Sequence, residues 1–99
     1  MVKLVVAYGP PEDATAFDQY YADTHAPLAQ AVPGLRNFEA GKVLGTPDGS
    51  AAPYHLIAQL SFDDLEALQT ALGTPEGQAA AGDIANFASG GATLMVVDA

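Results

Sequence analysis

Two histidines, His25 and His55, are the side chains of this 99-residue chain best suited to proton transfer near neutral pH. His25 precedes Ala26 and Pro27, and a proline disfavours helical structure at the residue before it. We therefore expect His25 at or near the C-terminus of a helix, with its side chain facing a pocket, where it would act as a general acid or base. The alternative is a helix-terminal histidine that binds backbone carbonyl groups.

His55 falls in residues 54–62, where side chains alternate as in a strand. One expected face carries Tyr54, Leu56, Ala58, Leu60 and Phe62, and the other carries His55, Ile57, Gln59 and Ser61. The second face is mixed in polarity, which is typical of a wall shared with a cavity or a subunit interface. Two histidines would divide the acid and base roles; otherwise His55 lies at a solvent-exposed rim beside a loop.

Aromatic and apolar side chains recur at helical spacing around His25. At about 100° per residue they project to one side of a helix, and we expect this stripe to line a substrate pocket. The alternative is ordinary core, in which each tyrosine hydroxyl has found a hydrogen-bond partner. The predicted catalytic residues are thus His25 and His55, and the predicted substrate-binding residues are Phe17, Tyr20, Tyr21, Leu28, Gln59 and Phe87.

Several classes of chemistry lack the residues they need. The chain has no cysteine, which excludes thiolate nucleophiles, disulfides, iron–sulfur clusters and cysteine-bound zinc. Neither G-x-S-x-G nor a dinucleotide-type glycine cluster occurs, so serine hydrolysis and Rossmann-type cofactor binding are unsupported. Asp23, His25 and His55 are the only plausible metal ligands, and Asp23 points away from the stripe in helical projection. We predict no metal and no cofactor.

Charge narrows the range of partners. Three basic residues against twelve acidic ones give a formal charge of −9, which repels phosphate backbones and anionic lipid surfaces. We predict neither a nucleic-acid nor a membrane partner. The apolar run at residues 2–7 is too short to cross a membrane and lacks a cleavage pattern after it, so it predicts a strand and a cytoplasmic location.

The elements that must position these residues follow the order strand, helix, strand, strand, helix, helix, strand. They are expected at residues 2–8, 17–28, 35–44, 54–62, 65–72, 75–87 and 93–97. This order predicts a single α+β domain over residues 1–99. Its fold would be ferredoxin-like, βαββαβ with an extra helical segment before the last strand, with helices on one face of an antiparallel sheet. Because three strands carry apolar residues on both faces, we expect the open sheet face to bind a second copy in a two-fold dimer.

Three motifs carry a family resemblance. They are Tyr-Tyr-x-x-x-His-x-Pro-Leu from Tyr20 to Leu28, Pro-Gly at Pro33 and Gly34, and Thr-Pro-Glu-Gly from Thr74 to Gly77. Through them nearly the whole chain resembles the EthD family, named for a protein of ethyl tert-butyl ether degradation. The resemblance implies a dimeric α/β barrel, in which two ferredoxin-like protomers pack sheet to sheet and each keeps a pocket between sheet and helices.

The resemblance also bears on function. Family members are often labelled reductases or oxidoreductases, and relatives on this scaffold include cofactor-independent monooxygenases, polyketide-processing enzymes and muconolactone isomerases. A subset resembling methylmuconolactone isomerase implies a catalytic histidine at His25 and a second at or near His55. We therefore expect a small cofactor-independent enzyme, oxidoreductase-like or isomerase-like, acting on a hydrophobic small molecule. The alternative is a non-catalytic binding or accessory protein of a degradation or biosynthetic pathway.

Overall fold

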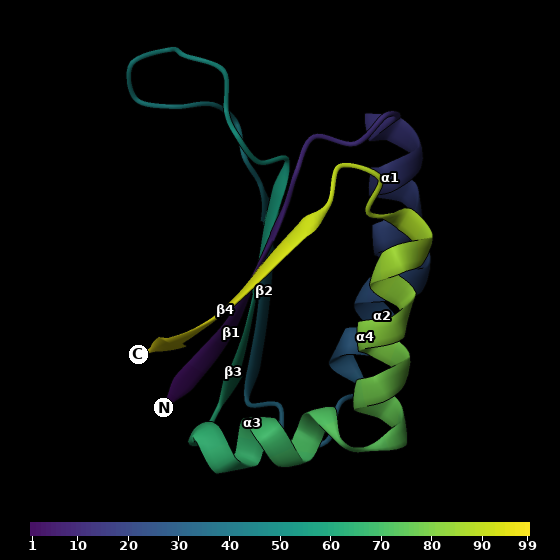
Figure 1. The fold of residues 1–99 in the computed structure, drawn as a ribbon, viewed down its shortest axis with the longest axis vertical. Coiled ribbons are helices and arrows are strands. Elements are labelled where there is room, and N and C mark those ends of the chain that lie inside the picture. Colours follow the sequence, from purple (N-terminus) through teal and green to yellow (C-terminus); the bar gives the residue numbers. More distant parts are fainter.

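The computed structural model describes residues 1–99 and has a four-stranded sheet with its helices on one side (Figure 1). The elements in chain order are β1 (Val2–Tyr8), α1 (Ala14–Tyr20), the π-helical segment η1 (Tyr21–His25), α2 (Ala26–Gln30), β2 (Asn37–Lys42), β3 (Leu56–Phe62), α3 (Leu65–Leu72), α4 (Pro75–Phe87) and β4 (Ala92–Asp98). The predicted α+β, ferredoxin-like class is confirmed, including the extra helix before the last strand.

The sheet has the order β2-β3-β1-β4, and every neighbouring pair is antiparallel. Strand β1 lies in the middle, where Leu4 faces Leu60 of β3 and Val6 faces Ala58. Side chains of β1 and β3 that alternate along the strands are buried beneath the helices, as the period-two pattern predicts. Strands β2 and β3 are shorter than expected: β2 covers 37–42, and β3 begins at Leu56.

The helix that carries His25 does not end there, which corrects the expectation drawn from Pro27. Helical backbone continues without a break from α1 through η1 into α2, so His25 lies in the middle of a helix of three segments. In η1 the N–H of Ala26 donates to the carbonyl of Tyr21, five residues earlier. This wider turn accommodates a proline that has no N–H to donate and whose ring crowds the preceding turn. His25 is therefore the last residue of a π-helical turn.

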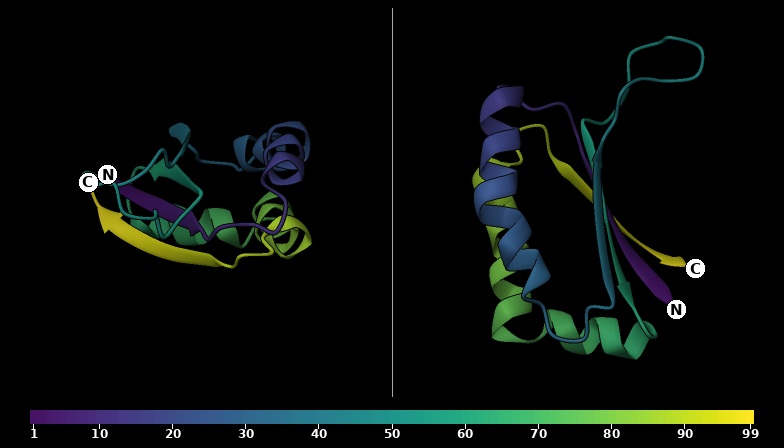
Figure 2. Two further views of the ribbon diagram at one scale, coloured as in Figure 1. Left: turned by 90° about the horizontal axis from the view of Figure 1, so that it is seen from above. Right: turned by 180° about the vertical axis from the view of Figure 1, so that it is seen from behind.

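Three caps define where the other helices begin. Asp13, Asp64 and Thr74 each accept a hydrogen bond from a backbone N–H in the first turn of α1, α3 and α4. Helix α4 packs against η1 and α2 on the same face of the sheet, while α3 lies across one end (Figures 1 and 2). This arrangement brings α4, late in the chain, beside the segment that holds His25.

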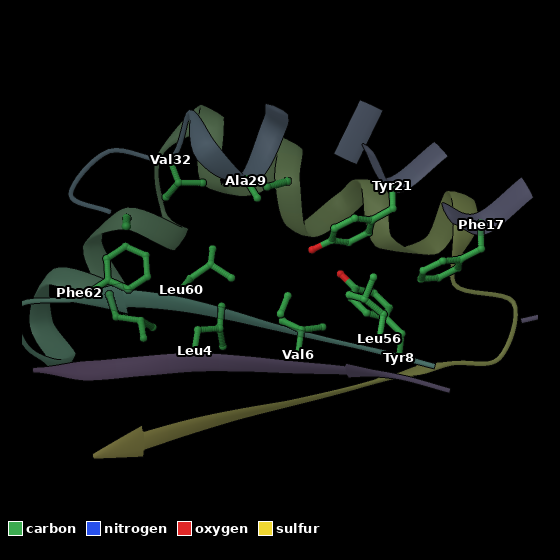
Figure 3. Close-up of a cluster of buried hydrophobic side chains, with 14 residues drawn as sticks. Leu4, Val6, Tyr8, Phe17, Tyr21, Ala29, Val32, Leu56, Leu60 and Phe62 are labelled. Carbon is green, nitrogen blue, oxygen red and sulfur yellow. The ribbon is translucent and has the colours of Figure 1, made fainter. Parts of the chain in front are cut away.

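The core lies between the helices and the sheet, and one end of it is aromatic (Figure 3). The ring of Tyr8, at the end of β1, contacts Phe17 edge-on with centroids 5.5 Å apart and Tyr21 with centroids 5.7 Å apart. Phe87 of α4 lies 5.4 Å from the same ring. Edge-to-face contacts of this kind stabilise a core beyond the area they bury.

The opposite face of the sheet carries no helix (Figure 2). Val5 lies on that face, with Gln59 of β3 and Met95 of β4 as its register partners. Strand β4 forms the edge of the sheet, and Leu94, Met95, Val96 and Val97 are 42–51% exposed. None of the helices combines the length and apolar character needed to cross a membrane.

Candidate functional site

His25 and Asp83, which are 58 residues apart in the chain, form a buried pair. His25 is 4% exposed and ends η1, while Asp83 is 7% exposed and lies in α4. The Nδ1 atom of His25 is 2.9 Å from Oδ2 of Asp83. Since an ionised carboxylate only accepts hydrogen bonds, Nδ1 carries the proton and donates it to Asp83. The other ring nitrogen, Nε2, is then unprotonated, and its lone pair can accept a hydrogen bond or a proton.

Asp83 is held by two further donors. The Tyr20 hydroxyl donates to Oδ1 at 2.6 Å, and the Asn86 amide donates to the same oxygen at 3.0 Å. Burial alone would raise the pKa of Asp83, but the hydrogen bonds from Tyr20, Asn86 and His25 together hold that pKa below its usual value. The carboxylate is therefore ionised at neutral pH and oriented on both of its oxygens.

The His25 ring faces a cavity of about 130 Å³ between the sheet and the helices. Fifteen of its seventeen lining residues are hydrophobic, and no Asp, Glu, Lys or Arg lines it. Its polar groups lie together on His25, Tyr8 and Tyr21. The Tyr8 hydroxyl is 3.4 Å from Nε2 of His25, a long hydrogen bond in which the hydroxyl donates. The cavity is thus apolar with one polar end.

The two cavity tyrosines differ in their hydrogen bonding. Figure 3 shows both hydroxyl oxygens directed into the space between sheet and helices. Tyr8 is bonded to His25, whereas the Tyr21 hydroxyl is buried without any partner. Burial raises the pKa of Tyr21 to about 12. Burial also raises the pKa of Tyr8, and electrostatic repulsion from Tyr21 and Asp83 raises it further. Both groups stay protonated at neutral pH.

His55 lies beside the loop that precedes β3, which agrees with the second of the two expectations, and not on the strand face with Gln59. It precedes the first residue of β3, so the strand alternation does not apply to it, and its side chain turns toward α1 instead of sharing a face with Gln59. Its Nε2 lies 2.7 Å from Oδ1 of Asp18, whose other oxygen binds Lys42 at 2.6 Å. Hydrogen bonds from Lys42 and then His55 lower the pKa of Asp18. His55 does not line the cavity, and its carboxylate partner differs from that of His25.

Only one of the six predicted substrate-binding residues lines the cavity. Tyr21 lines the cavity, whereas Tyr20 binds Asp83 behind His25. Phe17, Leu28 and Phe87 pack in the core outside the cavity lining, and Gln59 lies on the open sheet face with Lys3. His, Asp and Glu side chains nowhere gather in a group of three that could hold a metal ion.

Sequence reasoning missed Asp83, Asn86 and Tyr8. Asp83 could have been found from the sequence, because it falls within the apolar stripe of α4 that includes Ala80, Ile84 and Phe87. A carboxylate inside a buried stripe requires a partner. Nothing in the sequence names His25 as that partner, because the pairing depends on how α4 packs against η1.

Two distant solved structures share this fold. A dimeric ferredoxin-like protein from Thermobifida fusca superposes with a TM-score of 0.73 at 16% identity, covering 99% of this chain and 90% of that one. A cofactor-independent oxygenase from Streptomyces nogalater has a TM-score of 0.67 at 18% identity, covering 99% and 91%. At these identities the likeness concerns the fold alone.

Nearer relatives show the family. An uncharacterised 11.0 kDa protein from the thcB-thcC intergenic region of Rhodococcus erythropolis is 41% identical over 98 residues, which is 99% of this chain and 94% of that protein. The structure of an ethyl tert-butyl ether D (EthD) family protein from Bacillus halodurans has a TM-score of 0.95 at 41% identity, covering 100% and 98% of the two chains. The EthD domain model itself matches residues 9–91. The chain belongs to the EthD domain family.

Proposed function

We propose that this protein is a small cofactor-independent enzyme that transfers a proton within a hydrophobic small molecule, with His25 as the acid and base. The observation that carries the proposal is the buried Asp83–His25 pair at the polar end of an apolar cavity. A histidine whose Nδ1 proton is held by a carboxylate presents Nε2 as a base in a defined direction.

The chemistry follows from the tautomer. Nε2 of His25 takes a proton from a carbon next to a substrate carbonyl group. The electron pair of that C–H bond forms a carbon–carbon double bond, and the π pair of the carbonyl group moves onto its oxygen. Asp83 stabilises the imidazolium that forms, because a negative charge next to it favours the protonated ring. In a β,γ-unsaturated carbonyl compound the imidazolium then returns the proton to the γ carbon, and the carbonyl double bond re-forms. The product is the conjugated isomer, with no gain or loss of electrons. Tyr20 and Asn86 act as positioning residues, since they hold Asp83 rather than the substrate.

One neighbour with the same fold supports chemistry without a cofactor. The Streptomyces nogalater neighbour is described as a cofactor-independent oxygenase, which supports small-molecule chemistry on this scaffold without a bound cofactor. An oxidoreductase-like reaction on this chain would need an oxidant in addition to the base. Proton transfer needs only His25 and the carboxylate that holds it, and we therefore place it first.

A matched set of variants tests the role of His25. The assay is deuterium incorporation into cyclohexanone in D₂O, which reports proton abstraction without knowledge of the natural substrate. His25→Asn keeps an N–H that can reach Asp83 but removes the base, so exchange should fall to the uncatalysed rate. Asp83→Asn should have a similar effect, because its amide would donate to Nδ1 and place the ring proton on Nε2.

His55→Asn is the control, since it makes the same change at a histidine outside the cavity. Exchange in this variant should match that of the wild-type protein. If His55→Asn abolishes exchange as completely as His25→Asn, the two histidines share the chemistry. If the wild-type protein gives no exchange and only binds apolar ligands, the proposal of catalysis is wrong and a binding or accessory protein remains.

We further propose a homodimer through the open sheet face. Val5 and Met95 place apolar side chains on that face beside Gln59 and Lys3, and no helix covers them. Exposed apolar surface of this kind on a small protein marks an interaction site. The fold neighbour from Thermobifida fusca is described as dimeric, which is consistent with sheet-to-sheet pairing.

A further inference from the structure

The unpaired hydroxyl of Tyr21 points to the chemistry of the ligand. We infer that Tyr21 binds the oxygen of a neutral carbonyl compound whose remaining atoms are apolar and about the size of one six-membered ring. The inference rests on the proposed function in one respect, because it names the substrate class for the cavity that His25 faces. Its evidence is separate, since it comes from the hydrogen bonding and lining of the cavity.

Tyr21 is the group at the polar end of the cavity whose hydroxyl still lacks a hydrogen-bond partner. Nδ1 of His25 is bonded to Asp83, and Nε2 accepts from Tyr8. The Tyr21 hydroxyl is the one buried side-chain polar atom of residues 1–99 without a hydrogen-bond partner. Tyr21 itself is 5% exposed and lines the cavity. A buried donor without a partner is unfavourable, so a ligand that accepts from it gains what the free protein lacks.

The lining selects a neutral ligand. No cationic side chain faces the cavity, and Asp83 lies directly behind His25, so a carboxylate or phosphate would be buried without a counter-charge. The volume of about 130 Å³ is close to that of the engineered apolar cavity of about 150 Å³ that holds benzene in another protein. Leu72 and Leu94 line the cavity and are 37% and 49% exposed, so its accessible rim is apolar too.

A carbonyl oxygen matches the polar end better than a hydroxyl. The Tyr21 hydroxyl supplies a donor, and burial, which raises its pKa to about 12, keeps that proton in place at neutral pH. A carbonyl group only accepts, whereas a ligand hydroxyl brings a donor of its own that competes with Tyr8 for Nε2 of His25. The ring centroids of Tyr21 and His25 lie 5.3 Å apart, so a carbonyl compound bonded to Tyr21 would lie beside the ring that carries the base. The hydroxyl would then stabilise negative charge developing on the oxygen.

The test compares two ligands that differ in one group, a carbonyl oxygen in one and a CH₂ group in the other. Cyclohexanone and methylenecyclohexane have the same shape, and only the former has an oxygen that can accept from Tyr21. Their dissociation constants are measured by NMR titration of wild-type protein, Tyr21→Phe and Tyr54→Phe, where Tyr54 is an exposed tyrosine outside the cavity. We expect Tyr21→Phe to weaken cyclohexanone binding about 3- to 10-fold while methylenecyclohexane binds as before or more tightly. Tyr54→Phe should leave both constants unchanged.

Three results would overturn the inference. They are an unchanged ratio of the two constants in Tyr21→Phe, an equal change of that ratio in Tyr54→Phe, and a failure of cyclohexanone to bind wild-type protein. Deuterium exchange separates this inference from the proposed function. Ketone binding that depends on Tyr21 without His25-dependent exchange supports the ligand class and refutes the catalysis. His25-dependent exchange that Tyr21→Phe leaves unaffected supports the catalysis and refutes Tyr21 as the group that binds the oxygen.

Discussion

Removing the Tyr21 hydroxyl should make the free protein more stable, which is unusual for a change inside a core. Most substitutions of buried residues destabilise a protein, because they leave cavities or unpaired groups. Here the group removed is itself unpaired, since the Tyr21 hydroxyl is buried with no hydrogen-bond partner. Tyr21→Phe therefore tests whether that hydroxyl is free in the unliganded protein, independently of any ligand.

The magnitude follows from what the substitution keeps and removes. Phenylalanine preserves the ring, including its stacking on Phe17 at 6.0 Å and its edge contact with Tyr8 at 5.7 Å. A buried hydroxyl without a partner costs about 1–3 kcal/mol in lost hydration. Removing it should raise the free energy of unfolding by about 1 kcal/mol, which corresponds to roughly 4–8 °C in melting temperature for a domain of this size.

Urea denaturation at one fixed protein concentration measures the change, because dimerisation would make stability concentration-dependent. Tyr8→Phe is the matched control. It removes a hydroxyl that is bonded to His25, and it should lower the free energy of unfolding by about 0.5–1.5 kcal/mol. Tyr54→Phe, at an exposed position, should lie within about 0.5 kcal/mol of wild type. A destabilised Tyr21→Phe would refute the reasoning, since it would mean that the hydroxyl has a partner in solution.

Three further perturbations have expected outcomes, the last of which rests on the proposed dimer. A Cβ atom at Gly77 would collide with the backbone carbonyl of Ala71, so Gly77→Ala should lower the free energy of unfolding by about 1–3 kcal/mol in urea denaturation. The depressed pKa of Asp83 stabilises the fold above the unfolded-state pKa of about 3.9, and this stability is lost as the pH falls through the folded-state value. Asp83→Asn should flatten that part of the curve of stability against pH. Met95→Lys on the open sheet face should weaken dimerisation at least about 100-fold by sedimentation equilibrium.

Each of these has its own control. Gly82 lies in the same helix with open space around it, so Gly82→Ala should stabilise the protein by about 0.5–1 kcal/mol, and equal losses at both glycines would contradict the steric explanation. An acid transition unchanged in Asp83→Asn would assign the acid sensitivity to other carboxylates. Leu44→Lys changes a fully exposed loop residue, and a similar loss of dimer in that variant would argue against the open sheet face as the interface.

Local pattern predicted most of the fold because it depends on neighbours in the chain. The strand alternation of residues 56–62 and the Thr74-Pro75 start of α4 are set by side chains within a few residues, and both are present in the structure. The same rules failed at Pro27 and His55. Pro27 ends a helix by local rules, yet the helix continues through a π-helical turn. His55 lies one residue before β3, and its side chain is hydrogen-bonded to Asp18 of α1 instead of alternating with the strand residues.

The sequence by itself determined the element order, the motif from Tyr20 to Leu28 that identifies the family, and His25 as a candidate base. Only the tertiary structure decided which groups contact it. Asp83 reaches His25 because α4 packs beside η1, and Tyr8 reaches Nε2 because it ends the central strand beneath that helix. These partners are 58 and 17 residues away in the chain, and contacts at such separations depend on how whole elements pack. Residue types can indicate that a proton-transfer group is present, but its tautomer and the polarity of its pocket depend on three-dimensional packing.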